Sequence, residues 1–127
     1  MTACAYLAAS MSIWRKEASN RLPELQRSIS STLVESPSDL WMQLHSDFDR
    51  LCHQDPPPIE LLSRIWQYAR WSAEHESDDV QFAVINFFFE HIKDTRLYRI
   101  VLPQFMSRDE YETVCGLRAP TKTKGKR

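Results

Sequence analysis

Four side chains of the types that bind transition metals lie close together in the sequence: His45, Asp49, Cys52 and His53. His45 and Asp49 are four residues apart, which places them on one face of a helix. Cys52 and His53 share that face poorly. Neither the four donors of a structural zinc site nor a HExxH helix occurs. The pattern predicts polar residues on an amphipathic helix, with no metal site and no cofactor.

Carboxylates form a second group that could do chemistry, around one predicted turn: Glu74, Glu76, Asp78, Asp79, Glu90 and Asp94. Paired carboxylates can act as general acid and base where burial separates their pKa values. However, Asp78 and Asp79 stand at a predicted helix start, where negative charge is favourable. No serine–histidine–acid or cysteine–histidine pairing is justified either, so we expect a protein that is not an enzyme.

A polar stripe of Asp79, Asn86 and Glu90 runs along an otherwise apolar helix. Buried polar groups need partners, because an unpaired one costs about 1–3 kcal/mol. The preceding helix offers Arg64 opposite Glu90 and Gln67 opposite Asn86. We therefore predict a cross-helix network that fixes the register of the two helices.

The same region allows a second interpretation, in which a polar site binds a small molecule or a substrate. That site would consist of Arg64, Asn86, Glu90 and His91. His91 by itself shares a stripe with Val80, which favours a buried core histidine. Whether the stripe is structural or lines a ligand site stays open at this point.

Four tryptophans are a high number for this length, and aromatic residues dominate interfaces as well as cores. Trp66 lies on an apolar stripe and is predicted to be a core residue. Trp71 is offset from that stripe beside Arg70. It is a candidate for contact with a partner, and packing against the adjoining helix is the alternative.

The composition limits the fold and its partners. A chain of 127 residues forms one hydrophobic core. Its only glycines, Gly116 and Gly125, lie near the C-terminus, which argues against a β-rich fold and against phosphate-binding loops. Residues 118–127 carry five basic residues and no acid, so the preceding 117 residues have a formal charge of -6 within a total of -1.

This charge distribution predicts a protein partner, for which a basic protein would match the acidic body. It argues against specific nucleic-acid binding, since basic residues do not line a folded face. No apolar run approaches the roughly 18 residues that span a bilayer. Three cysteines far apart form no disulfide framework and fit a reducing compartment. We expect a cytoplasmic protein without membrane association, and its oligomeric state stays open.

The elements that carry these residues all have helical spacing. Ser36, Pro37 and Asp39 mark a helix start as N-cap, N1 and N3, and this helix ends before Asp55. A second amphipathic helix covers 59–75. Glu76 and Ser77 form a short link after this helix. Ser77 is the predicted cap of a third helix, which covers 78–93. This third helix is apolar nearly all round and is therefore predicted to be enclosed at the centre of the domain. Ser107 to Glu110 form a capping box that opens a short helix.

Residues 59–117 resemble a family of small uncharacterised bacterial all-helical proteins. The resemblance is carried by Ile65–Trp71, Asp78–Val80, Ala83–Val84 and Phe87–Ile92. It implies no activity, and by analogy of class it suggests an adaptor or immunity protein.

The sequence therefore predicts an all-α domain over 1–117, with five or six helices around the 78–93 helix, in a bundle or a helical-repeat-like stack. The first ten residues are expected to be frayed, and 118–127 to form a disordered basic tail. The predicted function is a non-catalytic protein–protein interaction module that uses an acidic surface, including Trp71, Glu76 and Asp79. A small-molecule-binding or enzymatic domain is the alternative.

Overall fold

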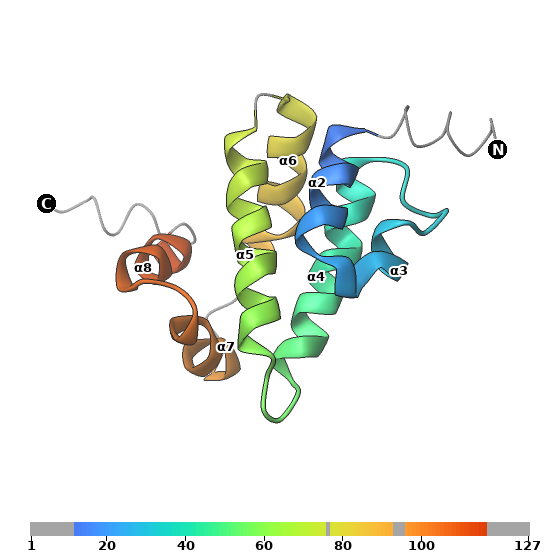
Figure 1. Cartoon of the computed structure of the whole chain (residues 1–127). Helices are drawn as coiled ribbons and strands as arrows, with labels where there is room; N and C mark the ends of the chain where they lie inside the picture. The colour runs from blue at the N-terminus through green and yellow to red at the C-terminus, as the bar shows by residue number, and fades with distance from the viewer. Residues whose placement is uncertain (1–11, 76, 93–95, 117–127) are drawn as a thin grey trace, which may run out of the picture.

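The computed structural model describes residues 12–75, 77–92 and 96–116 (Figure 1). Its elements are α2 (Ile13–Arg21), η1 (Pro23–Leu25), α3 (Gln26–Ile29), α4 (Pro37–Cys52), α5 (Ile59–Glu74), α6 (Asp78–Phe87), η2 (Phe89–His91), α7 (Arg96–Val101), η3 (Leu102–Gln104) and α8 (Arg108–Gly116). No strand occurs among the described residues, so the predicted all-α fold is confirmed. The predictions for 1–10, Glu76, Asp94 and the basic tail fall outside the described residues.

Three long helices form the body of the molecule. α5 runs antiparallel to α4 and to α6, so α4 and α6 run in the same direction (Figure 1). The short connection between α5 and α6 gives the helical hairpin that the sequence predicts. α2 packs against α5, and the Tyr68 hydroxyl donates a hydrogen bond to the Trp14 carbonyl at 2.7 Å.

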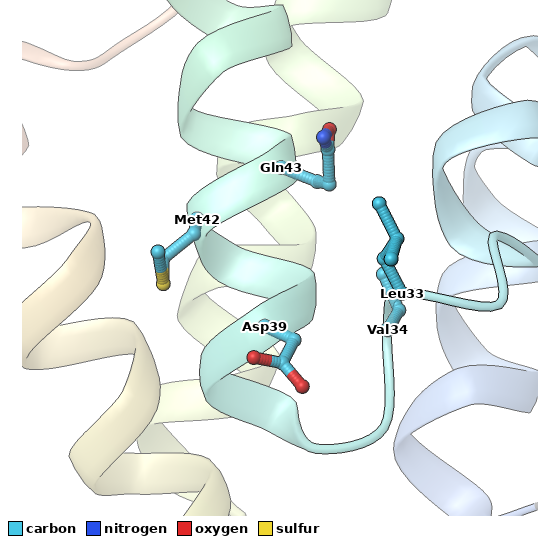
Figure 2. Close-up of a pocket in the computed structure, with 5 residues that line it drawn as sticks. All are labelled: Leu33, Val34, Asp39, Met42 and Gln43. Carbon is cyan, nitrogen blue, oxygen red and sulfur yellow. The ribbon is translucent and has the colours of Figure 1, made fainter.

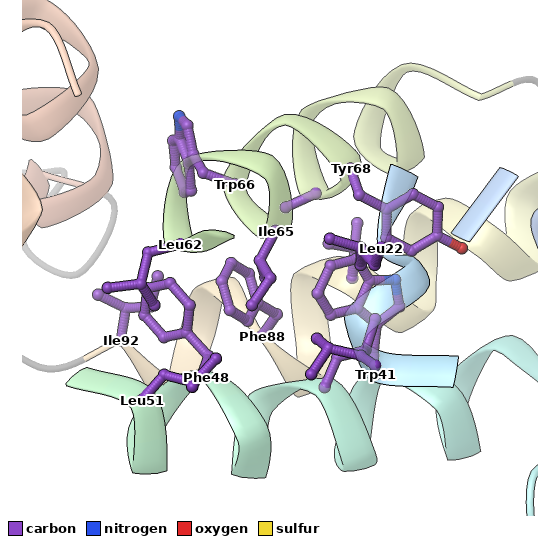
Figure 3. Close-up of a cluster of buried hydrophobic side chains, with 14 of the residues drawn as sticks. Leu22, Trp41, Phe48, Leu51, Leu62, Ile65, Trp66, Tyr68, Phe88 and Ile92 are labelled. Atoms are coloured by element: carbon purple, nitrogen blue, oxygen red, sulfur yellow. The ribbon is translucent and has the colours of Figure 1, made fainter. Parts of the chain in front are cut away.

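The core is an aromatic cluster between these three helices (Figure 3). Trp41 of α4 stacks on Tyr68 of α5, with ring centroids 5.2 Å apart. Phe88 lies 4.8 Å from Trp41 and 5.1 Å from Phe48, and it is fully buried. Trp66 is also buried, as predicted, and its ring lies 5.5 Å from that of Phe89. Phe88, which directly follows α6, therefore packs against rings of α4 and, 6.4 Å from Trp66, of α5.

The start of α4 follows the predicted cap. The Ser36 hydroxyl accepts from the Asp39 N–H at 3.2 Å, and Pro37 opens the helix, where its missing N–H costs nothing. In return, Asp39 Oδ2 accepts from the Glu35 N–H at 3.0 Å. The first of these bonds satisfies a backbone donor that the first turn of a helix leaves without a partner. The second ties the residue before the cap to this turn, and together they fix where α4 begins.

The capping box before α8 is confirmed as well. The Ser107 hydroxyl accepts from the Glu110 N–H, and Glu110 Oε1 accepts from the Ser107 N–H, both at 3.1 Å. The second oxygen of Glu110 accepts from Arg70 Nη1 of α5 at 2.5 Å. One carboxylate therefore caps α8 and also ties it to α5.

The end of α6 differs from the prediction. The helix was expected to reach Lys93, but it ends at Phe87, and Phe88 leaves the helical conformation with φ -130° and ψ -65°. A 3-10 turn, η2, follows. This break allows Phe88 and Ile92 to be fully buried while Glu90 and His91 are exposed.

Candidate interaction surface

The most distinctive surface of the molecule lies on α6. Its side chains Asp78, Asp79, Phe82, Ile85 and Asn86 recur at the spacing of one helix face, and we call them the α6 outer face. Phe82 is 59% exposed and Ile85 42%, while Asp78 and Asp79 are exposed and Asn86 is half-buried. The prediction that neighbours enclose this helix is therefore wrong.

The opposite side of α6 explains this arrangement. Val80, Ala83 and Val84 are buried and face the core with α4 and α5. Of the later helices, α7 packs against α4, and α8 is tied to α5 by the Arg70–Glu110 ion pair. The described part of the chain leaves the outer side of α6 uncovered.

The charge of this surface has a single sign. The sequence contains no lysine or arginine between Arg70 and Lys93, so every residue of formal charge in α6 and in its flanking turns is acidic. The neighbouring α4 has no lysine or arginine before Arg50. The Phe82 and Ile85 side chains are therefore exposed among carboxylates.

Met42 is a further exposed apolar side chain, on the neighbouring helix α4. It is 55% exposed, and its side chain points toward α6 (Figure 2). On its other side, Met42 borders an open hollow of about 290 Å³ that is lined by Leu33, Val34, Asp39, Met42 and Gln43. Leu33 is the most exposed large apolar side chain of the described residues, at 79%.

The predicted network between Arg64 and the polar stripe is wrong. Arg64 binds Glu24 through Nη1–Oε1 and Nη2–Oε2, at 2.8 and 2.6 Å, and donates to the Arg21 carbonyl at 3.0 Å and to Glu60 at 3.1 Å. Its guanidinium group lowers the pKa of Glu24 to about 2. Arg64 therefore holds α5 to α2 and η1, because carboxylates there satisfy its charge.

The other members of the predicted network also find partners in their own helices. Gln67 donates to the Ser63 hydroxyl at 3.4 Å, and Asn86 donates to the Phe82 carbonyl at 2.9 Å. The Asn86 amide thus finds its acceptor one turn earlier in α6. The predicted cross-helix network did not take such local bonds into account. None of these bonds crosses between α5 and α6.

His91 is exposed, so the prediction of a buried core histidine is wrong. The break after Phe87 rotates it away from the face that it would occupy in a continuous helix. Its ring lies 5.4 Å from that of His45. Arg64, by contrast, is engaged on the side of α5 that faces η1, so its bonds do not join it to Asn86, Glu90 or His91 in the predicted ligand site.

Trp71 is half-buried. Its position agrees both with packing inside the fold and with contact to a partner. Its ring stacks on Tyr68 with centroids 5.7 Å apart and packs edge-on against His75 at 4.6 Å. The exposed part borders an open hollow of about 220 Å³ with Arg21, Gln67, Arg70 and Glu74. Arg21 pairs there with Glu17, and Arg70 pairs with Glu110, so both cations already have a carboxylate.

The turn between α5 and α6 is organised by His75. The Ser77 N–H donates to His75 Nδ1 at 3.0 Å, and the Gln81 amide donates to the His75 carbonyl. Ser77 occupies the N-cap position as predicted, but its side chain makes no cap bond. Asp79, one of the predicted binding residues, follows in the first turn and is exposed.

The residues described in α4 do not gather into a metal centre. Across 12–75, 77–92 and 96–116, no three histidine, cysteine or acidic side chains are placed to hold an ion. His53 Nδ1 lies 2.8 Å from the Asp49 carbonyl, and Cys52 is buried. Burial raises the pKa of the Cys52 thiol to about 12, so this group is a poor nucleophile and a poor metal ligand.

Within the described ranges, no helix has both the length and the apolar character that crossing a membrane requires. Comparison with protein-family models, curated proteins and solved structures finds no match. The resemblance of 59–117 to small bacterial proteins stays a prediction.

Proposed function

We propose that this chain is a non-catalytic protein–protein interaction module of the adaptor or immunity type, acting in the cytoplasm. The observation that carries this proposal is the exposure of Phe82 and Ile85 on a helix whose charged residues are all acidic. The α6 outer face is the surface that would bind the partner. Met42 of α4 extends it.

The physical basis is the cost of leaving large apolar side chains in water. Burying an exposed Phe or Ile contributes about 1.5–3 kcal/mol, and aromatic residues are common at the energetic centre of interfaces. Carboxylates around such a centre add little affinity by themselves, but they steer a basic partner and repel acidic ones. Asp78 and Asp79 have this position relative to Phe82.

The alternative, a small-molecule or enzymatic site around Arg64, finds less support in the geometry. The Arg64 guanidinium is used by Glu24, Glu60 and the Arg21 carbonyl. The remaining residues of that alternative lie at the surface of α6 and η2. We therefore place the functional surface on α6 rather than on α5.

A photo-crosslinking amino acid at Ile85 tests the proposal. The full chain would carry it at position 85 or, as a control, at Arg108 of α8, whose side chain is 88% exposed. In a lysate of the organism that encodes the chain, we expect a stoichiometric adduct from position 85 alone. Phe82→Ser should abolish this adduct, and Asp79→Lys should weaken it.

Salt provides a second criterion, because a contact steered by carboxylates weakens as ionic strength rises. The position-85 adduct should therefore be stronger at low salt than at moderate salt. Equal yields from positions 85 and 108, or a position-85 yield that Phe82→Ser leaves intact, would refute the proposed function.

A further inference from the structure

We infer that the partner presents an amphipathic α-helix to the α6 outer face, with apolar side chains along one side and lysine or arginine beside them. This inference rests on the proposed function and names the class of partner. The evidence comes from the shape of the surface, from its charge and from the segments that could otherwise cover it.

The fold itself favours a helix over an extended segment. An extended peptide binds well where it can add a strand to an open sheet edge, and the described residues contain no strand. The backbone groups that a bound segment buries against α6 find no sheet edge there, so they must be satisfied within the segment. An α-helix satisfies them internally.

The dimensions of the surface agree with this occupant. From Asp78 to Asn86 the α6 outer face extends about 12 Å, at 1.5 Å per residue. Phe82 and Ile85 are the apolar contacts along this length, and Met42 adds a third from α4. About two turns of a partner helix, with apolar residues three and four apart, match this length.

The charge of the surface selects a basic helix. Asp78 and Asp79 carry two negative charges at the N-terminus of α6, where the helix dipole contributes only about half a positive charge. The local charge therefore stays negative, by about -1.5. No lysine or arginine within 71–92 compensates it.

Three other occupants match the surface less well. A second copy that paired through the same face would add only carboxylates and would supply no lysine or arginine to pair with Asp78 and Asp79. The chain's residues 118–127 are basic, but their only apolar residues are alanine and proline, which cannot cover Phe82 and Ile85. Residues 1–11 contain apolar side chains but no charged one, so they would leave the carboxylates unmatched.

A panel of three synthetic peptides of equal length tests the chemistry of the occupant. The first is helical, with a leucine stripe flanked by lysine and arginine. The second has the same stripe flanked by glutamate, and the third is a scramble of the first without a stripe. We expect the full chain to bind the first at least about tenfold more tightly than either control, measured by fluorescence anisotropy.

Surface variants locate the binding site. Phe82→Ser should weaken binding of the first peptide by about tenfold. The double variant with Asp78→Asn and Asp79→Asn should weaken it by a similar factor at low salt. Ile100→Ser is the matched control, because Ile100 is 60% exposed and lies on α7. This control should leave the affinity unchanged. A thermal melt of each variant verifies that the fold is retained.

The outcomes separate the two proposals. If position 85 crosslinks a partner but the glutamate peptide or the scramble binds as tightly as the first peptide, the helix inference fails and the proposed function stands. An adduct with a second copy, or with residues 1–11 or 117–127 of the same chain, also overturns the inference. If position 85 yields no more adduct than position 108, the proposed function itself fails.

Discussion

Arg64 and Glu24 form a bidentate ion pair across 40 residues of sequence, with Nη1–Oε1 and Nη2–Oε2 distances of 2.8 and 2.6 Å. Two parallel bonds hold the guanidinium and carboxylate groups in one plane, a geometry that a lysine cannot reproduce. The pair fixes η1 against α5, and the bond from Arg64 to the Arg21 carbonyl adds the end of α2.

This pair predicts a specific dependence of stability on pH. The pKa of Glu24 is lowered from 4.5 to about 2 by Arg64, so the folded state favours the carboxylate. The resulting stability is present above the ordinary pKa and is lost as pH falls from about 4.5 to about 2. Glu24→Gln should therefore be less stable than the native chain near neutral pH, and the difference should shrink over that acid range.

Urea unfolding of both chains across this pH range measures the difference. Glu60→Gln is the matched control, because Glu60 meets the same guanidinium group through one longer bond of 3.1 Å and is 85% exposed. A Glu24→Gln effect that is the same at acid and neutral pH would contradict the assignment of the stabilisation to the carboxylate.

Phe88 and Phe82 provide a second prediction, since the two residues are close in sequence and differ in environment. Phe88 is fully buried among aromatic rings, so Phe88→Ala should lower the free energy of unfolding by about 3–5 kcal/mol. Phe82→Ala should change it by less than about 0.5 kcal/mol. Chemical denaturation measures both, and Phe88→Leu replaces the alanine variant if that variant does not fold. Similar losses at the two positions would show that Phe82 is buried.

The Ser36 cap predicts a moderate loss of stability. Ser36→Ala removes the acceptor of the Asp39 N–H and should cost about 0.5–2 kcal/mol. Ser38→Ala, two residues further along the same turn, should cost less because Ser38 is not the cap. Thermal unfolding of the two variants provides the comparison, and a larger loss for Ser38→Ala would contradict the cap assignment.

The buried thiol of Cys52 should be almost unreactive. Its pKa of about 12 leaves little thiolate near neutral pH, so a thiol reagent should label it at least about 1,000-fold more slowly than a free cysteine. The test uses a chain in which serine replaces Cys4 and Cys115. Labelling should become rapid in denaturant, and rapid labelling of the native chain would show that Cys52 is accessible.

Local patterns predicted most of the helix boundaries. Ser36, and Ser107 with Glu110, fix helix starts because their side chains bond to the nearest backbone donors. These interactions span three residues and need no knowledge of the rest of the fold. The start of α5 after the consecutive prolines was predictable for a similar reason, since proline cannot continue a helix.

The α6 outer face could not be predicted from periodicity alone. A helix with apolar residues on every side implies neighbours on every side, but the number of available helices decides whether this occurs. α4 and α5 cover Val84 and Phe88, and no described helix covers Phe82. The signal was present in the short length of the chain, which provides few helices to surround a third one.

The Arg64 network was missed because its partners are remote in sequence. Arg64 lies in α5, the first helix of the α5–α6 hairpin, yet it bonds to Glu24, 40 residues away. Charge and helical spacing offered Glu90 as an equally good partner. Only the placement of α2 and η1 beside α5 distinguishes the two, and that placement is a tertiary property.

The attachment of α2 to α5 has a consequence for how the chain is made. α2 leaves the ribosome before α5, because Tyr68 of α5 follows its bonding partner Trp14 by 54 residues. At about 5–20 residues per second, this interval lasts roughly 3–11 s. During each round of synthesis α2 therefore waits for its partner helix, and the N-terminal part of the fold is completed only once the middle of the chain has emerged.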